Sequence, residues 1–151
     1  METTSEELAQ SIVRRLMVLL RYQRRFTHLM QRTYGVSGRQ ISALRYLARD
    51  GPHSVSEISR YLYIGDGTTS PMLDRMERAG LVVRERCLRD ARRVLVQITD
   101  KGREICQQAP AGLYGKLRTE LPQLPAHELT EMDAALERLM ATAQLDESLL
   151  E

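Results

Sequence analysis

The stretch that decides the fold is GDGTTSPMLDRMERAGLVVRERCLRDARRVLVQITDKG, residues 65–102. After the opening turn, apolar side chains recur at helical spacing and predict a helix that Gly80 ends. Two runs rich in Val and Leu, residues 81–87 and 93–98, predict strands joined by an arginine-rich turn. Thr99 then caps a further helix. The stretch therefore predicts a helix, a β-hairpin and a second helix.

Pro71 limits where the first of these helices can begin. Proline has no backbone N–H and is tolerated in the first turn of a helix, where that N–H has no partner. We therefore expect the helix to begin between Gly67 and Thr69.

Helical periodicity continues on both sides of this stretch. Capping-box patterns, which mark helix starts, occur at Thr4 with Glu7, Ser37 with Gln40 and Ser54 with Glu57. The first of these helices is expected over residues 5–33. Beyond the hairpin, Pro110 and Gly112 kink or end the helix that Thr99 opens, and a last helix follows Pro125. The predicted order is four helices, a hairpin and two further helices.

Length and composition limit the class of protein. A chain of 151 residues fits one domain with a real core. No apolar run approaches the roughly 20 residues that a membrane helix needs, and the acidic start METTSEEL is unlike a signal peptide. Cys87 and Cys106 form no Cys-x-x-Cys pair, which excludes a disulfide scaffold or a zinc knuckle. We expect a cytoplasmic protein with no membrane partner.

Charge is distributed unevenly along the chain. Residues 1–118 carry 21 basic and 12 acidic side chains, whereas residues 119–151 carry one basic and eight acidic ones. Twenty of the 22 basic residues are arginine, whose planar fork suits phosphates and guanine edges. One end of the protein is therefore expected to meet a polyanion. The alternative is that the arginines only keep a helical protein soluble.

A helix with a small-residue face beside a basic hairpin is the arrangement by which a winged helix-turn-helix meets duplex DNA. We predict a mainly α fold with a small β-hairpin wing, in a single domain over residues 1–151. The DNA-binding lobe is expected over 35–100. The helices of 1–34 and 101–151 are expected to form a dimerisation region, because their apolar stripes have no partner within the lobe. The alternative is a monomeric helical bundle.

Three segments resemble the MarR family of winged-helix regulators. GTTSPMLDRMERAGLV (67–82) resembles the recognition helix and its stop, DARRVLVQITDKG (90–102) the wing, and VSGRQISALRYL (36–47) the preceding helix. The recognition helix is most similar to the organic-hydroperoxide-sensing branch. That branch places its peroxidatic cysteine in the first helix, and this chain has no cysteine before Cys87. The resemblance therefore carries the DNA-reading surface but not the sensing chemistry.

Candidate DNA contacts follow from these two lines of reasoning. A recognition helix reads bases from its N-terminal turns, and the resemblance implies that Arg92 enters the minor groove while Asp90 holds it in position. A narrow minor groove concentrates negative potential and favours a guanidinium. Capping is the alternative role for the serine and threonine hydroxyls. The expected DNA-binding residues are Ser54, Ser56, Thr68, Ser70, Pro71, Arg75, Arg84, Arg86, Asp90 and Arg92.

The resemblance also implies a small aromatic or lipophilic effector bound between the dimer helices and the lobe. The candidate lining residues are Tyr22, Phe26, His28, Tyr46 and Tyr63, for which simple core packing is the alternative. Both cysteines are expected to be buried and unreactive, because nothing near them in sequence stabilises a thiolate.

The whole chain is therefore interpreted as a transcriptional regulator, a repressor that binds a pseudo-palindromic double-stranded operator as a homodimer. The alternatives are a thiol-based redox regulator of the same fold and an interaction module that has lost DNA binding. An enzyme is not expected. His28, His53 and His127 lack metal-ligand spacing, and no lysine completes a phosphate loop after Gly65. We expect no catalytic residue, no metal site and no cofactor.

Overall fold

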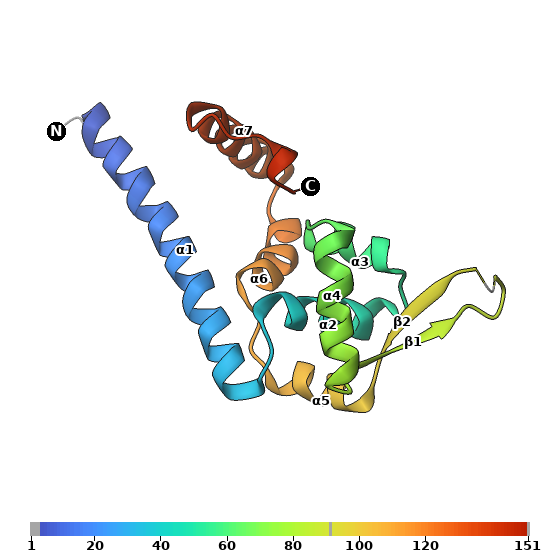
Figure 1. The fold of residues 1–151 in the computed structure, drawn as a ribbon. Coiled ribbons are helices and arrows are strands. Elements are labelled where there is room, and N and C mark those ends of the chain that lie inside the picture. The colour runs from blue at the N-terminus through green and yellow to red at the C-terminus, as the bar shows by residue number, and fades with distance from the viewer. Residues whose placement is uncertain (1–3, 91, 151) are drawn as a thin grey trace.

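The computed structural model of the chain describes residues 4–90 and 92–150. A lobe of short helices lies between the long α1 on one side and the protruding hairpin on the other (Figure 1). Helix α7 stands apart from this lobe. The elements are α1 (Ser5–Tyr34), α2 (Gly38–Asp50), α3 (Val55–Leu62), α4 (Asp66–Arg78), β1 (Val82–Arg86), β2 (Val94–Ile98), α5 (Asp100–Gln108), α6 (Leu113–Glu120), η1 (Leu121–Gln123), α7 (Ala126–Thr142) and η2 (Glu147–Leu150).

The predicted helix starts are confirmed at the three capping boxes. Each N-cap side chain accepts a hydrogen bond from the backbone three residues on, and that residue's side chain accepts one in return. The predicted first helix is correct to within one residue. It ends at Tyr34 because Gly35 adopts the left-handed region, with φ of 68°.

The predicted start of α4 is wrong. The helix begins at Asp66, and the carbonyl oxygen of Gly65 accepts the N–H groups of Thr68 and Thr69 at 3.0 and 3.1 Å. Pro71 therefore lies in the second turn, where its missing N–H leaves the carbonyl of Gly67 without its usual partner four residues on. Gly67 is exposed, so water can satisfy that carbonyl.

The hairpin forms as predicted, with β1 and β2 antiparallel from Val82 opposite Ile98 to Arg86 opposite Val94. An isolated bridge joins β2 to the segment before α3, through His53 and Val96. Ala91, at the predicted tip of the hairpin, lies outside the described residues. The predicted fold class, mainly α with a small β-hairpin wing, is confirmed.

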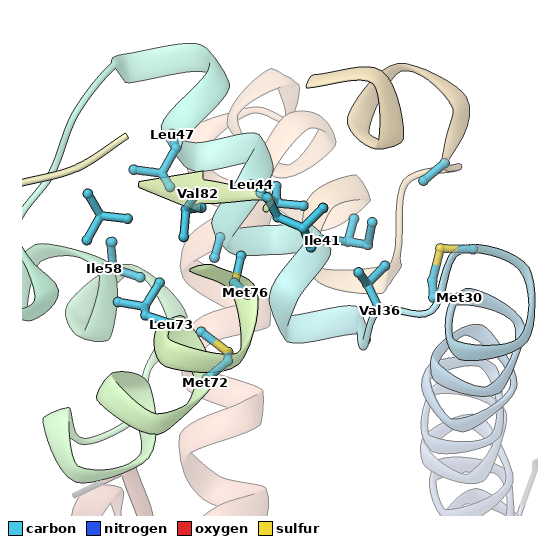
Figure 2. Close-up of a cluster of buried hydrophobic side chains, with 14 of the residues drawn as sticks. Met30, Val36, Ile41, Leu44, Leu47, Ile58, Met72, Leu73, Met76 and Val82 are labelled. Carbon is cyan, nitrogen blue, oxygen red and sulfur yellow. The ribbon is translucent and has the colours of Figure 1, made fainter. Parts of the chain in front are cut away.

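The buried core lies between α2, α3, α4 and the base of the hairpin (Figure 2). Leu44, Ile58, Leu73 and Met76 are fully buried there. The end of α1 reaches this core through Met30. The lobe therefore has one continuous interior, which fixes α4 and the hairpin relative to each other.

The segment after the hairpin forms three α-helices, one more than predicted. Ala109 ends α5 in an extended conformation, and Gly112 then caps α6. A Cβ atom on Gly112 would lie 2.5 Å from the Phe26 ring, so α1 passes too close for any larger residue. Glycine is required here by packing, and that packing separates α5 from α6.

Two elements have apolar faces that the chain itself leaves uncovered. The first half of α1 exposes Ile12, Val13, Met17 and Leu20, the last to 63%. No residue of α7 is buried, and Leu136 on that helix is 54% exposed. Within the described residues, no helix is both long and apolar enough to cross a membrane.

Candidate nucleic-acid interface

Helix α4 presents one polar and one apolar face, as its sequence predicts. Thr69, Met72, Leu73 and Met76 are buried against the lobe. On the opposite side lie Thr68, Pro71 and Arg75, which are exposed, and Ser70, which is half-buried. Neither Thr68 nor Ser70 caps the helix, because the N-cap residue is Gly65. Helix capping, the alternative role considered for these two hydroxyls, therefore does not apply to them.

A pair of buried hydroxyls joins α3 to α4. Ser59 Oγ lies 2.9 Å from Thr69 Oγ1, which in turn donates to the carbonyl of Gly65 at 3.1 Å. Both residues are buried, at 4% and 0% exposure. No local pattern in the sequence indicates this pair, because its two residues lie ten positions apart on different helices.

The two serines at the start of α3 have different environments. Ser54 is the N-cap, and its hydroxyl is engaged in the capping box with Glu57. Ser56 is exposed and donates to the Asp66 carboxylate at 2.9 Å. Hydrogen bonds from the Ser59 and Ser56 hydroxyls hold the pKa of Asp66 below its usual range. These contacts place the N-termini of α3 and α4 side by side.

Arg84 is bound within the protein rather than presented to solvent. Its Nη1 lies 2.8 Å from a carboxylate oxygen of Asp74 and 2.8 Å from one of Glu77, both on α4. Although burial opposes its charge, these hydrogen bonds raise the pKa of Arg84. The geometry thus corrects the expectation of a free phosphate contact, because two carboxylates neutralise the guanidinium. Arg84 instead braces β1 against α4.

The wing tip is shaped by Asp90. Its carboxylate accepts the backbone N–H of Arg92 at 3.0 Å, and its carbonyl accepts the N–H of Arg93 at 3.0 Å. Asp90 was expected to orient the Arg92 side chain, whereas it fixes the backbone that carries it. Arg86, Arg92 and Arg93 are exposed along this hairpin. The tip therefore presents guanidinium groups on a turn of defined shape.

The five aromatic residues predicted to line one effector pocket do not come together. Phe26 is buried in the core, Tyr22 lies under the Lys116 ammonium group, and His28 lies on the exposed face of α1. Tyr46 stacks between His53 and Tyr61. Of the five, only Tyr63 lines the cavity that lies beside the first turn of α4. Helical spacing alone does not determine which face of a neighbour a side chain meets.

That cavity has a volume of about 810 Å³ and lies between the lobe and the C-terminal helices. Its walls are largely aromatic and aliphatic, and they include the first turn of α4. Among the lining residues that the sequence reasoning did not assign to a pocket are Tyr61, Tyr114, Arg118, Leu136 and Met140, with Thr68 from α4 and Gly65 from the turn before it. No sequence pattern could collect them, because they come from four separate helices and the turn before α4.

An aromatic column runs from the wing to this cavity. Tyr46 stacks on His53 and on Tyr61 with ring centroids 4.1 and 4.0 Å apart. The Arg118 guanidinium lies 3.6 Å from the centre of the Tyr61 ring and donates to the Tyr61 carbonyl. His53 is bridged to Val96 of β2 through both backbone hydrogen bonds. The column therefore joins α6 to the base of the wing.

The two cysteines differ in reactivity. Hydrogen bonds from the backbone of Arg89 and Asp90 lower the pKa of Cys87, whereas burial raises the pKa of Cys106. Both side chains are half-buried rather than buried. The expectation that nothing stabilises a thiolate therefore does not hold for Cys87, whose pKa is lowered.

The described residues contain no group of three or more His, Cys, Asp or Glu side chains arranged to hold a metal ion. What the lobe does contain is a helix-turn-helix, α3 and α4, followed by an arginine-rich wing. These features define the class of protein, a winged helix-turn-helix.

Comparison with known proteins gives the family. A family model described as "MarR family" matches residues 34–93. The organic hydroperoxide resistance transcriptional regulator of Bacillus subtilis (strain 168) is 32% identical over 106 residues, which are 68% of this chain and 69% of that relative. The HTH-type transcriptional regulator MgrA of Staphylococcus aureus is 33% identical over 82 residues, 54% of this chain and 56% of the relative. The chain belongs to the MarR family of winged-helix transcriptional regulators.

Solved structures share the fold. AbsC, a MarR family transcriptional regulator from Streptomyces coelicolor, has a TM-score of 0.65 at 24% identity over 95% of this chain and 98% of its own. Sco3205, a MarR family regulator from the same organism solved in complex with DNA, has a TM-score of 0.64 at 22% identity, covering 97% and 93%.

Proposed function

We propose that this chain is a sequence-specific DNA-binding repressor that acts as a homodimer on a pseudo-palindromic operator. The observation that carries the proposal is the fixed pairing of an exposed recognition-helix face with an arginine-rich wing. Arg84 links these two elements through Asp74 and Glu77. A brace of this kind holds the base-reading helix and the wing at one relative angle, as binding in adjacent grooves requires.

In the major groove, we propose that Thr68, Ser70, Pro71 and Arg75 meet base edges. Hydroxyls bond base edges or phosphates, Pro71 offers an apolar surface to a thymine methyl, and Arg75 can reach a guanine. In the minor groove we assign Arg92, whose backbone Asp90 fixes.

Phosphate contacts flank these groups. The exposed Arg86 on β1 is available for one. At the start of α3, backbone N–H groups favour an anion, whereas the hydroxyl of Ser56 would have to exchange its hydrogen bond to Asp66 for one to a phosphate. Ser54 donates both its backbone N–H and its hydroxyl to the Glu57 carboxylate, so neither group is available for a phosphate.

The dimer is supported by the uncovered apolar faces of α1 and α7. Both would lose their water contact if a second copy packed on them. A two-fold dimer would place its recognition helices about 34 Å apart, one turn of the duplex.

The cavity supports an aromatic or lipophilic effector. Three tyrosines and the aliphatic side chains of Leu136 and Met140 favour such a ligand, and Arg118 adds a positive charge. Because Thr68 lines the same cavity, a bound ligand would contact the first turn of α4. Release from DNA follows if the ligand binds better to a conformation with displaced recognition helices.

The experiment that tests DNA binding is fluorescence anisotropy with duplex DNA from the region upstream of the protein's own gene. A scrambled duplex is the control, and both are titrated at two salt concentrations. We expect tight binding of one dimer to the native duplex, with weak and salt-sensitive binding to the scrambled one. Binding to neither duplex at low salt would refute the proposal in favour of an interaction module.

The effector site is tested with anilinonaphthalene sulfonate, an aromatic anion that fluoresces in apolar surroundings. We expect the probe to bind and to lower the affinity for duplex DNA. Tyr114→Ala, which removes part of the cavity wall, should weaken both effects. Tyr22→Ala, outside the cavity, is the matched control and should change neither.

A thiol-based regulator remains a second candidate, which the lowered pKa of Cys87 in the wing favours. Oxidation there would change the turn that carries Arg92. Peroxide should then release wild-type protein from DNA but not a variant with Cys87→Ser and Cys106→Ser. Equal release of the two proteins would exclude thiol sensing.

A further inference from the structure

The first helix carries a row of arginines that the proposed interface does not use. Between Glu7 and Asp50 the sequence has nine arginines and no acidic residue. Five of them share one face of α1, on which His28 also lies, and all five are exposed. We call this set the arginine stripe: Arg14, Arg21, Arg24, Arg25 and Arg32.

The position of the stripe follows from helix geometry. At about 100° per residue, its side chains fall within roughly 100° of arc, on the side opposite Phe26 and Met30. Those two residues are buried and attach α1 to the lobe. The stripe therefore faces away from the body of the protein, along about 27 Å of helix from Arg14 to Arg32.

The charge of the stripe is not neutralised by the chain. No carboxylate of the described residues forms an ion pair with any of the five guanidinium groups. Elsewhere the chain does pair its arginines, as Arg49 with Asp50 and Arg84 with Asp74 show. Like charges three or four residues apart, such as Arg21 and Arg25, destabilise a helix. A polyanion bound along the stripe would relieve that repulsion.

Charge and shape decide between the polyanions. An interfacial helix inserts its apolar face into lipid, but Phe26 and Met30, which lie opposite the stripe in the second half of α1, are buried against the lobe. Guanidinium groups bind phosphate with two parallel hydrogen bonds. A row about 27 Å long covers most of one duplex turn of about 34 Å. Duplex DNA is therefore the partner that the stripe fits.

We propose that the arginine stripe of α1 is a second, sequence-independent surface for the phosphates of duplex DNA. The proposal rests on the proposed function in one respect, that the protein works on DNA. It assigns a surface distinct from the wing, because α1 and the hairpin lie on opposite sides of the lobe (Figure 1).

The test compares two variants with the same change in net charge. The stripe variant carries Arg21→Gln, Arg25→Gln and Arg32→Gln. The control carries Arg15→Gln, Arg103→Gln and Arg138→Gln, three exposed arginines outside the stripe and the wing. Affinity for a random-sequence duplex of about 40 base pairs, roughly four turns, is measured by anisotropy across a range of salt. Thermal melting of each variant verifies that it is folded.

We expect the stripe variant to bind at least tenfold more weakly at low salt. Because each lost phosphate contact removes about 0.9 from the slope of log K against log salt, that slope should fall by about 2 to 3 per protomer. The control should stay within twofold of wild type. An unchanged slope in the stripe variant would overturn the proposal. A stripe variant that loses binding to phosphatidylglycerol vesicles but keeps its affinity for the duplex would overturn it too.

Arg92→Ala, measured in parallel, separates this proposal from the proposed function. If Arg92→Ala weakens binding and the stripe variant does not, the stripe proposal fails alone. If the stripe variant lowers the slope and Arg92→Ala has no effect, the stripe proposal stands and the wing assignment fails.

Discussion

At the scale of single residues, two arginines of the hairpin region have different roles, which only their surroundings in the structure reveal. Arg84 is held by two carboxylates of α4, whereas Arg92 is exposed on the wing. The sequence alone does not distinguish these residues, because the carboxylates that hold Arg84, those of Glu77 and Asp74, lie seven and ten residues away in the chain. The contact of Asp90 with Arg92 could be anticipated from the sequence, since the two residues are only two positions apart.

Replacing Arg92 by Ala should cost about 1–3 kcal/mol of DNA affinity, as expected when a groove contact is lost. Anisotropy with the native duplex measures the change. Arg103→Ala, an exposed arginine on α5, is the control and should leave affinity within twofold. Unchanged binding after Arg92→Ala would show that the wing does not enter a groove.

Cys87 should be alkylated faster than Cys106 near neutral pH. Its pKa is lowered, so a larger fraction is thiolate at a given pH, whereas the raised pKa of Cys106 keeps that thiol protonated. The rate with iodoacetamide is measured from pH 6 to 9, the range around the usual thiol pKa of about 8.5, on Cys87→Ser and Cys106→Ser variants. Equal rates would contradict the assignment.

At the scale of elements, the helix starts were predictable because a capping box is a local device. Its donor and acceptor lie three residues apart, so sequence spacing is enough. The start of α4 was mispredicted because Gly65 caps it without a side chain. Pro71 was then taken as a start signal, although exposed backbone at Gly67 tolerates the lost hydrogen bond.

The contact between α3 and α4 should be sensitive to Thr69→Val. This change keeps the shape but removes the hydroxyl that Ser59 contacts at 2.9 Å, so unfolding should become easier by about 0.5–1.5 kcal/mol. Urea denaturation measures the loss. Thr68→Val, at the exposed neighbour, should change stability by less. Equal effects would show that the buried hydroxyl pair is not a stabilising contact.

The junction of α5 with the hairpin should not tolerate Gly102→Ala. The added Cβ would lie 2.4 Å from the Leu81 carbonyl oxygen and 2.8 Å from Ile98 Cγ1, so we expect a loss of about 1–3 kcal/mol from overpacking. Gly67→Ala is the matched control. Its Cβ would meet nothing within 4 Å, and it should stabilise α4 by about 0.4–1 kcal/mol. Urea midpoints that rank the two variants the other way would contradict this packing.

At the scale of the whole molecule, the described chain leaves apolar surface on α1 and α7 that a monomer has no means to cover. The lobe, by contrast, is closed around its own core. The division into a DNA-binding lobe at residues 35–100 and flanking dimerisation helices stays a prediction, and the uneven burial supports it.

Leu20→Glu should weaken the dimer, since a charge would be buried without a partner at the contact between copies. Leu20 is 63% exposed in the single chain. Sedimentation velocity should show a shift toward monomer at micromolar concentration, where a typical stable dimer persists. Leu88→Glu is the control, because Leu88 is fully exposed on the wing and should leave the assembly unchanged. A dimer that survives Leu20→Glu would place the interface elsewhere.

The sequence by itself determined the helix starts that capping boxes mark, the hairpin and the family motifs, because each depends on residues a few positions apart. The tertiary structure alone decided that Arg84 is a brace and that, of the five predicted pocket residues, only Tyr63 lines the cavity. It also put five of the six arginines of α1 on an outward face with no acidic partner among the described residues. These properties depend on which helix faces pack together, and packing joins residues that are distant in the chain.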